Sequence, residues 1–112
     1  MEKEEKNAKT ETVEKEDRLL VPLSRTYYFE GEEIDTMDLR KLRDVTAADM
    51  IKVSRMMSLT GNVESNEEIS LEYACNLAGS VTEHPIEFYK SLKAPDAMKL
   101  KNRVTGFLFG AV

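Results

Sequence analysis

Cysteine, histidine and tryptophan are the scarcest residues of this chain, and their scarcity excludes several classes of protein. The 112 residues include one cysteine, one histidine and no tryptophan. One cysteine forms no internal disulfide, so a disulfide scaffold is excluded, and so is a zinc site built from cysteines. No apolar run approaches the roughly 18 residues that a membrane helix needs. The first 18 residues also lack the apolar segment of a secretory signal. These absences predict a soluble intracellular protein with no membrane partner and no cofactor.

The motifs of common enzyme classes are absent as well. There is no P-loop, no dinucleotide-binding glycine pattern, no zinc-protease HExxH and no GxSxG. Cys75 and His84 are the only nucleophile and base to consider, and on a straight helix their spacing is roughly 13 Å, too far for proton transfer. Carboxylates gather at 30–38 without the pattern of a calcium loop. We therefore predict no catalytic residue, no metal site and no enzyme activity.

Charged residues are plentiful but unevenly distributed. Residues 1–83 carry 19 acids and 11 bases, whereas residues 84–112 carry two acids and five bases. Among these bases, Lys99, Lys101 and Arg103 form either a contact face for an acidic partner or the solvated side of a helix. Nucleic-acid-binding proteins have a denser basic footprint, so we expect no nucleic acid partner. Surfaces of opposite charge also favour head-to-tail association between copies.

The pattern of apolar residues predicts an α+β fold that is mainly helical and follows a charged arm. Residues 1–18 have too few apolar side chains to bury, so we expect a disordered arm. Residues 19–112 then form a single domain. Its start is a short apolar segment in which Pro22 blocks regular structure, followed by a β-hairpin at about 25–39 that turns at Gly31. Because a lone hairpin is marginal in water, one of its faces is expected to pack on helices.

A bundle of about four helices is expected after the hairpin, at about 46–60, 66–81, 85–92 and 95–109. Capping patterns predict the first two starts, Thr46 with Asp49 and Ser65 with Glu68. Prolines fit the first turns of the last two helices. Helical spacing predicts which side chains face inward. They are Ala47, Met50, Ile51, Ser54 and Met57 on the first helix, Ile69, Tyr73, Ala74, Leu77 and Val81 on the second, and Ala97, Leu100, Lys101, Val104, Phe107 and Leu108 on the last.

Two apolar features fit a buried core less well than the rest. Met56 falls away from the inward face of its helix, and methionine adapts to irregular contact surfaces. Phe109 lies about 100° around the last helix from its neighbour. We predict a partner-binding surface of Met56, Val104, Phe107, Leu108 and Phe109, with Lys99, Lys101 and Arg103 as a basic contact face. For Val104, Phe107 and Leu108, a place in the core is an equally good interpretation.

The order of several short motifs resembles a known family. The motifs are Tyr28-Phe-Glu-Gly-Glu-Glu-Ile34, Met37-Asp-Leu-Arg-Lys-Leu-Arg-Asp-Val-Thr-Ala-Ala-Asp-Met50, Ser70-Leu-Glu-Tyr-Ala-Cys-Asn-Leu-Ala78, Pro85-Ile-Glu-Phe-Tyr-Lys-Ser-Leu92 and Asp96-Ala-Met-Lys-Leu-Lys-Asn-Arg-Val-Thr-Gly-Phe-Leu108. Over about residues 24–109 this order resembles the tail assembly chaperones of contractile-tailed phages and phage-like bacteriocins.

The resemblance implies a non-catalytic role in virion assembly. Such a protein binds the tape measure protein, keeps it soluble and promotes assembly of tail tube subunits around it, and it associates with itself. It acts in the host bacterial cytoplasm and is not expected in the mature particle. A longer form made by ribosomal frameshifting is compatible with the codons available for 100–102 and 106–108. The alternative interpretation is a small phage-encoded DNA-binding or host-interaction regulator.

Overall fold

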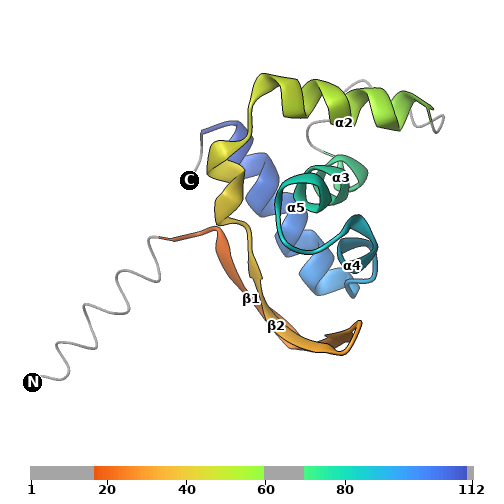
Figure 1. Ribbon diagram of the computed structural model, residues 1–112. Helices are drawn as coiled ribbons and strands as arrows, with labels where there is room; N and C mark the ends of the chain where they lie inside the picture. Colours follow the sequence, from red (N-terminus) through yellow and green to blue (C-terminus); the bar gives the residue numbers. More distant parts are fainter. Residues whose placement is uncertain (1–16, 60–69, 111–112) are drawn as a thin grey trace, which may run out of the picture.

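The computed structural model describes residues 17–59 and 70–110, which form a hairpin and a cluster of helices. In chain order the elements are β1 (Leu20–Phe29), β2 (Glu32–Asp38), the 3₁₀ turn η1 (Arg40–Asp44), α2 (Ala47–Leu59), α3 (Leu71–Val81), α4 (Ile86–Lys90) and α5 (Ala94–Leu108). Helix α2 lies across the top of Figure 1, and the hairpin extends from the opposite side of the cluster. This arrangement confirms the predicted hairpin packed on four helices.

The hairpin turns at Glu30 and Gly31, whose φ angles are 50° and 82°. Glycine adopts positive φ without steric cost, so Gly31 makes the tight turn as predicted. The strands pair antiparallel, and the register shifts between Pro22 and Tyr27. The prediction that Pro22 blocks regular structure is wrong, because β1 begins at Leu20. An edge strand with an irregular register tolerates a residue that has no amide hydrogen.

Helix α3 is the centre of the helical cluster. Helices α2, α4 and α5 all pack against it, and the six consecutive residues from Tyr73 to Ala78 are buried. Cys75 and Ala78 are absent from the predicted inward face, but neighbours on several sides bury both. The backbone of α4 also comes very close, because a Cβ added at Gly79 would lie 2.7 Å from the Cα of Ile86. The core therefore surrounds α3.

The starts of the helices test the predicted caps. At α2 the box is confirmed, since the Asp49 amide donates to Thr46 Oγ1 at 3.2 Å and the Thr46 amide donates to Asp49 Oδ2 at 3.0 Å. Helix α3 begins later than predicted, because Ser70 is extended and its Oγ accepts from the amide of Tyr73 at 3.0 Å. A helix unbroken from residue 66 is therefore wrong. The Ser65 box itself lies outside the described residues.

The last two helices also differ slightly from their predicted bounds. Helix α4 is confined to five residues, with Pro85 as its N-cap. Helix α5 begins at Ala94, and Pro95 lies in its first turn as expected. Of its predicted inward face, Leu100 and Val104 are fully buried. The other four residues, Ala97, Lys101, Phe107 and Leu108, are only half-buried.

The inward face of α2 is rotated from the prediction. Val53 and Met57 are buried and Met50 is partly buried. Ile51, which was predicted to face inward, has 53% of its surface exposed. Since Met50, Val53 and Met57 follow the three- and four-residue spacing of a narrow stripe, α2 contacts the core along one side only. Most other residues of α2 are exposed among the residues that the structure describes.

Candidate interaction surface

A buried carboxylate holds the hairpin on α5. Asp96 is fully buried, and it accepts hydrogen bonds from the Ser24 amide at 2.9 Å, the Ser24 hydroxyl at 2.8 Å and the Tyr27 hydroxyl at 2.7 Å. Burial by itself would raise the pKa of Asp96, but the hydrogen bonds from Tyr27 and Ser24 outweigh it and the pKa is lowered. The junction therefore favours an ionised Asp96 and fixes the direction of β1.

Aromatic rings complete this junction. Tyr27 and Phe29 pack edge to face on Phe88 of α4, with ring centroids 6.0 Å and 5.6 Å apart. The Tyr27 oxygen also accepts from the Lys93 amide at 2.9 Å. Burial and the bond to Asp96 raise the pKa of Tyr27. Because alternate residues of a strand face opposite sides, Tyr28 points away from the helices, and it is 75% exposed.

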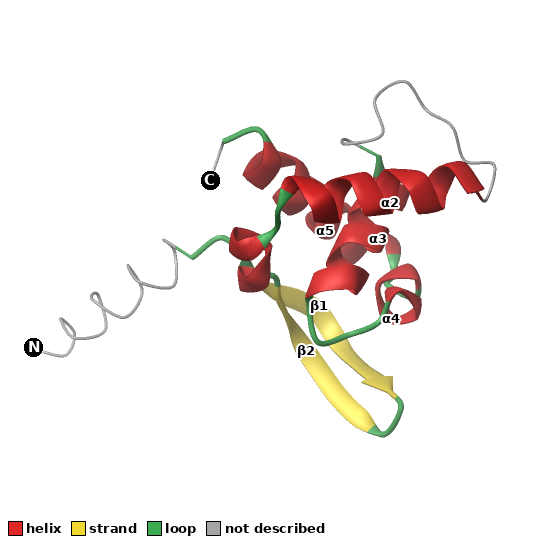
Figure 2. Cartoon of the chain, turned by 45° about the horizontal axis from the view of Figure 1, so that its top comes forward, coloured by secondary structure: helices red, strands yellow, loops and turns green. Residues whose placement is uncertain are grey.

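The predicted apolar contact residues do not form one surface. Phe109 is 64% exposed at the end of α5, and Met56 is 47% exposed in the second half of α2. Both views place the end of α5 beside the start of α2, on the left, and the other end of α2 on the right (Figures 1 and 2). Phe107 and Leu108 are half-buried against the core. Val104 is fully buried, so we place it in the core rather than on a contact surface.

The predicted basic face is largely occupied within the molecule. Lys99 Nζ donates to the carbonyl of Pro22 at 2.9 Å and lies 3.6 Å from Asp96. Arg103 Nε donates to the carbonyl of Arg18 at 3.0 Å. Only Lys101, which is half-buried, has no such bond among the described residues. Two of the three bases thus hold the start of the hairpin against α5.

Sequence reasoning missed two features of this surface. The burial of Asp96 and its role in holding the hairpin could not be predicted from neighbouring residues, because its hydrogen-bond partners lie about 70 positions earlier in the chain. Ile51 and Leu59 are exposed on α2, by 53% and 82%. Their spacing was the signal that could have found them. Ile51 and Leu59 lie eight residues apart and so fall on one side of the helix, away from the buried stripe that contains Val53.

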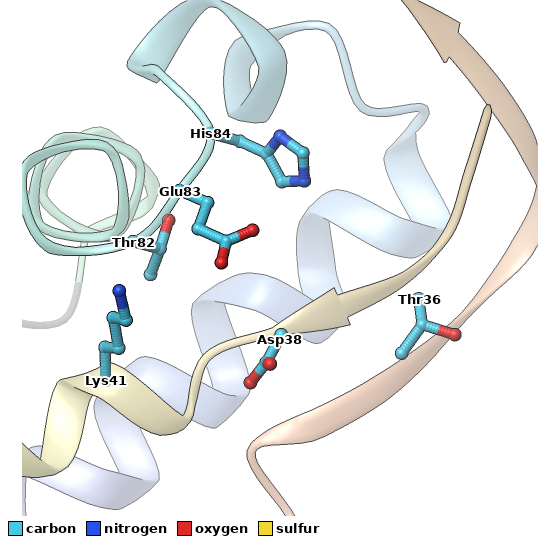
Figure 3. Close-up of a pocket in the computed structure, with 6 residues that line it drawn as sticks. All are labelled: Thr36, Asp38, Lys41, Thr82, Glu83 and His84. Atoms are coloured by element: carbon cyan, nitrogen blue, oxygen red, sulfur yellow. The ribbon is translucent and has the colours of Figure 1, made fainter. Parts of the chain in front are cut away.

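The small hollow in Figure 3 lies between β2, η1 and the turn that joins α3 to α4. It is lined by Thr36, Asp38, Lys41, Thr82, Glu83 and His84, and its volume is about 40 Å³, far below the roughly 300–1,000 Å³ of pockets that bind small organic molecules. Hydrogen bonding from Arg40 lowers the pKa of Asp38 to about 2. The hollow therefore has no room for an organic substrate.

A second, open groove lies between α3, α4 and the start of α5. Its volume is about 400 Å³, and its lining includes Cys75, Tyr89 and Leu92. Burial raises the pKa of the Cys75 thiol to about 11, so the reactive thiolate is scarce at neutral pH. Among residues 17–59 and 70–110, no three carboxylates, histidines or cysteines lie close enough to hold a metal ion. No described helix has the length and apolar character needed to cross a membrane.

The comparison with protein families decides the assignment. The family model described as "Phage tail assembly chaperone proteins, E, or 41 or 14" matches residues 20–108. This chain belongs to the phage tail assembly chaperones. The match begins at the first residue of β1 and ends at the last residue of α5, so the hairpin is part of the family's fold. No curated protein matches the chain, and no solved structure matches it.

Membership of the tail assembly chaperones explains the character of the surface. The family is non-catalytic, and the described chemistry agrees with a binding role, since Cys75 is buried and the ring of His84 lies against Phe88 at 4.9 Å. Exposed apolar side chains lie on β1, α2, α3 and α5 and are available for contacts with other proteins. Family membership implies tail assembly partners in general.

Proposed function

We propose that this tail assembly chaperone binds the tape measure protein, keeps it soluble and promotes assembly of tail tube subunits around it. It acts in the host bacterial cytoplasm, together with further copies of itself, and leaves before the particle is mature. A frameshifted longer form would extend the chain beyond α5. The single observation that carries this proposal is the family match over the whole hairpin and helical cluster.

The exposed apolar residues support a role in binding a long client. Phe109 follows the last residue of α5 and Met56 lies in the second half of α2, so one chaperone has two separate apolar spots. A client with repeated apolar side chains can engage both spots, and several chaperones along one client gain from multivalent binding. We expect Phe109, with the half-buried Phe107 and Leu108, to make the larger contact because three apolar residues adjoin there.

Co-expression with the tape measure protein tests the proposal directly. We expect a soluble complex containing several chaperones per client, measured by pull-down followed by light scattering. Replacing Phe109 with Ser should reduce the amount of soluble client, and Met56→Ser should reduce it less. Met98→Ser is the matched control, since Met98 is 46% exposed but lies outside the predicted surface. A client that stays insoluble and unbound beside the folded chaperone would refute the proposal.

The alternative role as a DNA-binding regulator is weakened by the bases of α5. Binding through that helix needs Lys99 and Arg103 to reach phosphates, yet both side chains donate to the backbone of residues 18–22. A DNA mobility shift that disappears with added salt would favour the regulator. We expect no shift.

A further inference from the structure

The outward side of α2 is both apolar and basic. Ile51, Arg55 and Leu59 follow one another at four-residue spacing, and Lys52 and Met56 lie beside them at the same spacing. All five side chains are exposed, and no acidic residue occurs between Met50 and Leu59. We call these five residues the α2 face. A helix side of this composition fits a partner that combines negative charge with an apolar side chain.

The outward side of the hairpin has the complementary composition. Tyr28 is 75% exposed there and lies directly opposite Glu33 in the strand register. Asp35 shares the side of Glu33, Glu30 lies at the turn, and all three acids are exposed. Glu32, opposite Phe29 in the register, lies on the other side of the hairpin. Arg25 is the only base between residues 20 and 38. We call Tyr28, Glu30, Glu33 and Asp35 the hairpin face.

We propose that the hairpin face of one copy docks on the α2 face of the next copy. Lys52 and Arg55 would lie against the hairpin acids, and Tyr28 would pack between Ile51 and Leu59, with Met56 at the edge of the face left for the client. In both views α2 and the hairpin tip lie at opposite ends of the molecule, so the two faces of one chain cannot meet each other (Figures 1 and 2). Every copy therefore offers both halves of the contact.

This contact makes a chain of copies rather than a closed pair. Two different surfaces that join head to tail leave one of each open at the ends, so the association repeats. The attraction is partly electrostatic and should weaken as salt screens the exposed charges. This inference rests on the proposed function in one respect, the self-association of the chaperone. It adds which two surfaces form that contact. A repeating row of chaperones would suit a long client.

Charge reversal on each face tests the contact with the chaperone alone. We compare wild type, Lys52→Glu/Arg55→Glu and Glu33→Lys/Asp35→Lys by sedimentation across a range of concentrations at low and high salt. Wild type should associate, and each double variant should lose at least about tenfold in association constant because like charges then oppose each other. Lys93→Glu/Lys101→Glu changes the net charge as much as the first variant, but at the N-cap and middle of α5, and it should associate like wild type.

An equimolar mixture of the two reversed variants gives the sharpest result. The acidic α2 face of one variant then meets the basic hairpin face of the other, and each remaining wild-type face has its natural partner, so association should return. Wild type that stays monomeric, or a mixture that stays dissociated while circular dichroism shows both variants folded, would overturn the inference. If a reversed variant fails to fold, Tyr28→Ser and Leu59→Ser replace it and should each weaken association.

Because no client is present in this test, its failure leaves client binding untouched. A chaperone that still solubilises the tape measure protein but never self-associates would refute only the head-to-tail contact. Loss of client binding by the α2 variant, with self-association unchanged, would also refute the contact and assign the α2 face to the client instead.

Discussion

Helices α2 and α3 are neighbours of similar length, yet they occupy very different environments. Six residues of the 11-residue α3 are buried, against two of the 13-residue α2. Helix α3 is covered by α2, α4 and α5, whereas α2 packs mainly on α3. Helix α3 therefore forms the centre of the core, whereas α2 packs on it along one side and leaves its outer side available to partners.

The side chains of the two helices fit these different roles. Small residues on α3, such as Ala74, Ala78 and Gly79, let neighbouring helices approach closely. Helix α2 instead carries long side chains, including Lys52, Arg55 and Met56, on the side that faces solvent. Changes to exposed side chains outside packed or hydrogen-bonded sites usually alter stability by less than about 0.5 kcal/mol, so these residues are available to contact a partner.

Truncating one leucine on each helix should give the largest contrast in stability. Leu77 is fully buried on α3, whereas Leu59 is 82% exposed on α2. We expect Leu77→Ala to lower the free energy of unfolding by about 2–5 kcal/mol, since a buried cavity remains. Leu59→Ala should change it by less than about 0.5 kcal/mol. Urea unfolding followed by circular dichroism measures both, and equal losses would show that α2 is as deeply packed as α3.

Asp96 should give the next largest effect, on the hairpin rather than on the helices. Replacing it with Ala leaves the Ser24 and Tyr27 donors without their buried acceptor, at a cost of about 2–3 kcal/mol. Asp35→Ala is the control, because Asp35 is exposed and should cost less than about 0.5 kcal/mol. A loss at Asp35 as large as that at Asp96 would contradict the anchoring role.

The stability of the protein should also depend on pH through the carboxylate of Asp96. The pKa of Asp96 is lowered from its ordinary 3.8 in the folded protein, so its contribution is complete above that value and is lost as the pH falls below it. Asp38, with a pKa of about 2, titrates in the same acid range. The difference in unfolding free energy between wild type and Asp96→Asn isolates Asp96, and it should shrink as the pH falls below 3.8. A constant difference would show that the charge of Asp96 contributes nothing.

Replacing Gly79 with Ala should lower the free energy of unfolding by a smaller amount, because α3 and α4 approach closely there. A methyl group there meets the backbone of Ile86 at 2.7 Å, so α4 must shift, and we expect Gly79→Ala to cost about 1–3 kcal/mol. Ser58→Ala on the exposed side of α2 is the matched change and should be neutral or slightly stabilising, because Ala favours a helix. Stabilisation by Gly79→Ala, measured by thermal unfolding, would mean that α4 does not need its close contact with α3.

Local chemistry allowed much of the fold to be predicted. The turn at Gly31, the capping box at Thr46 and Asp49, and the order of hairpin and helices follow from residues close together in the sequence. Errors arose where distant segments decide the outcome. Pro22 lies in a strand because α5 and β2 hold the segment there, and the burial of α3 on several sides depends on three other helices.

The candidate surface was less predictable for the same reason. Helical angles alone gave the exposure of Met56 and Phe109, and both are exposed. The same angles could not fix which stripe of α2 packs inward, so Ile51 was assigned to the core in place of Val53. Angles on one helix also say nothing about neighbours, and the distance between Met56 and Phe109 depends on how α2 and α5 are placed in the fold.

Removing the caps of α2 and α3 should give the smallest change in stability, but it tests the difference between the two helices most locally. Thr46 caps α2 and Ser70 caps α3, each by accepting an amide hydrogen bond, and removing such an oxygen costs typically about 1 kcal/mol. Thr46→Ala should chiefly increase hydrogen exchange in the first turns of α2, because that helix can fray without disturbing the core. Ser70→Ala should lower global stability instead, since opening α3 exposes the residues that all other helices pack on. If both variants change exchange across the whole molecule to the same extent, α2 and α3 form one cooperative unit, and the outer side of α2 is less independent than its exposure indicates.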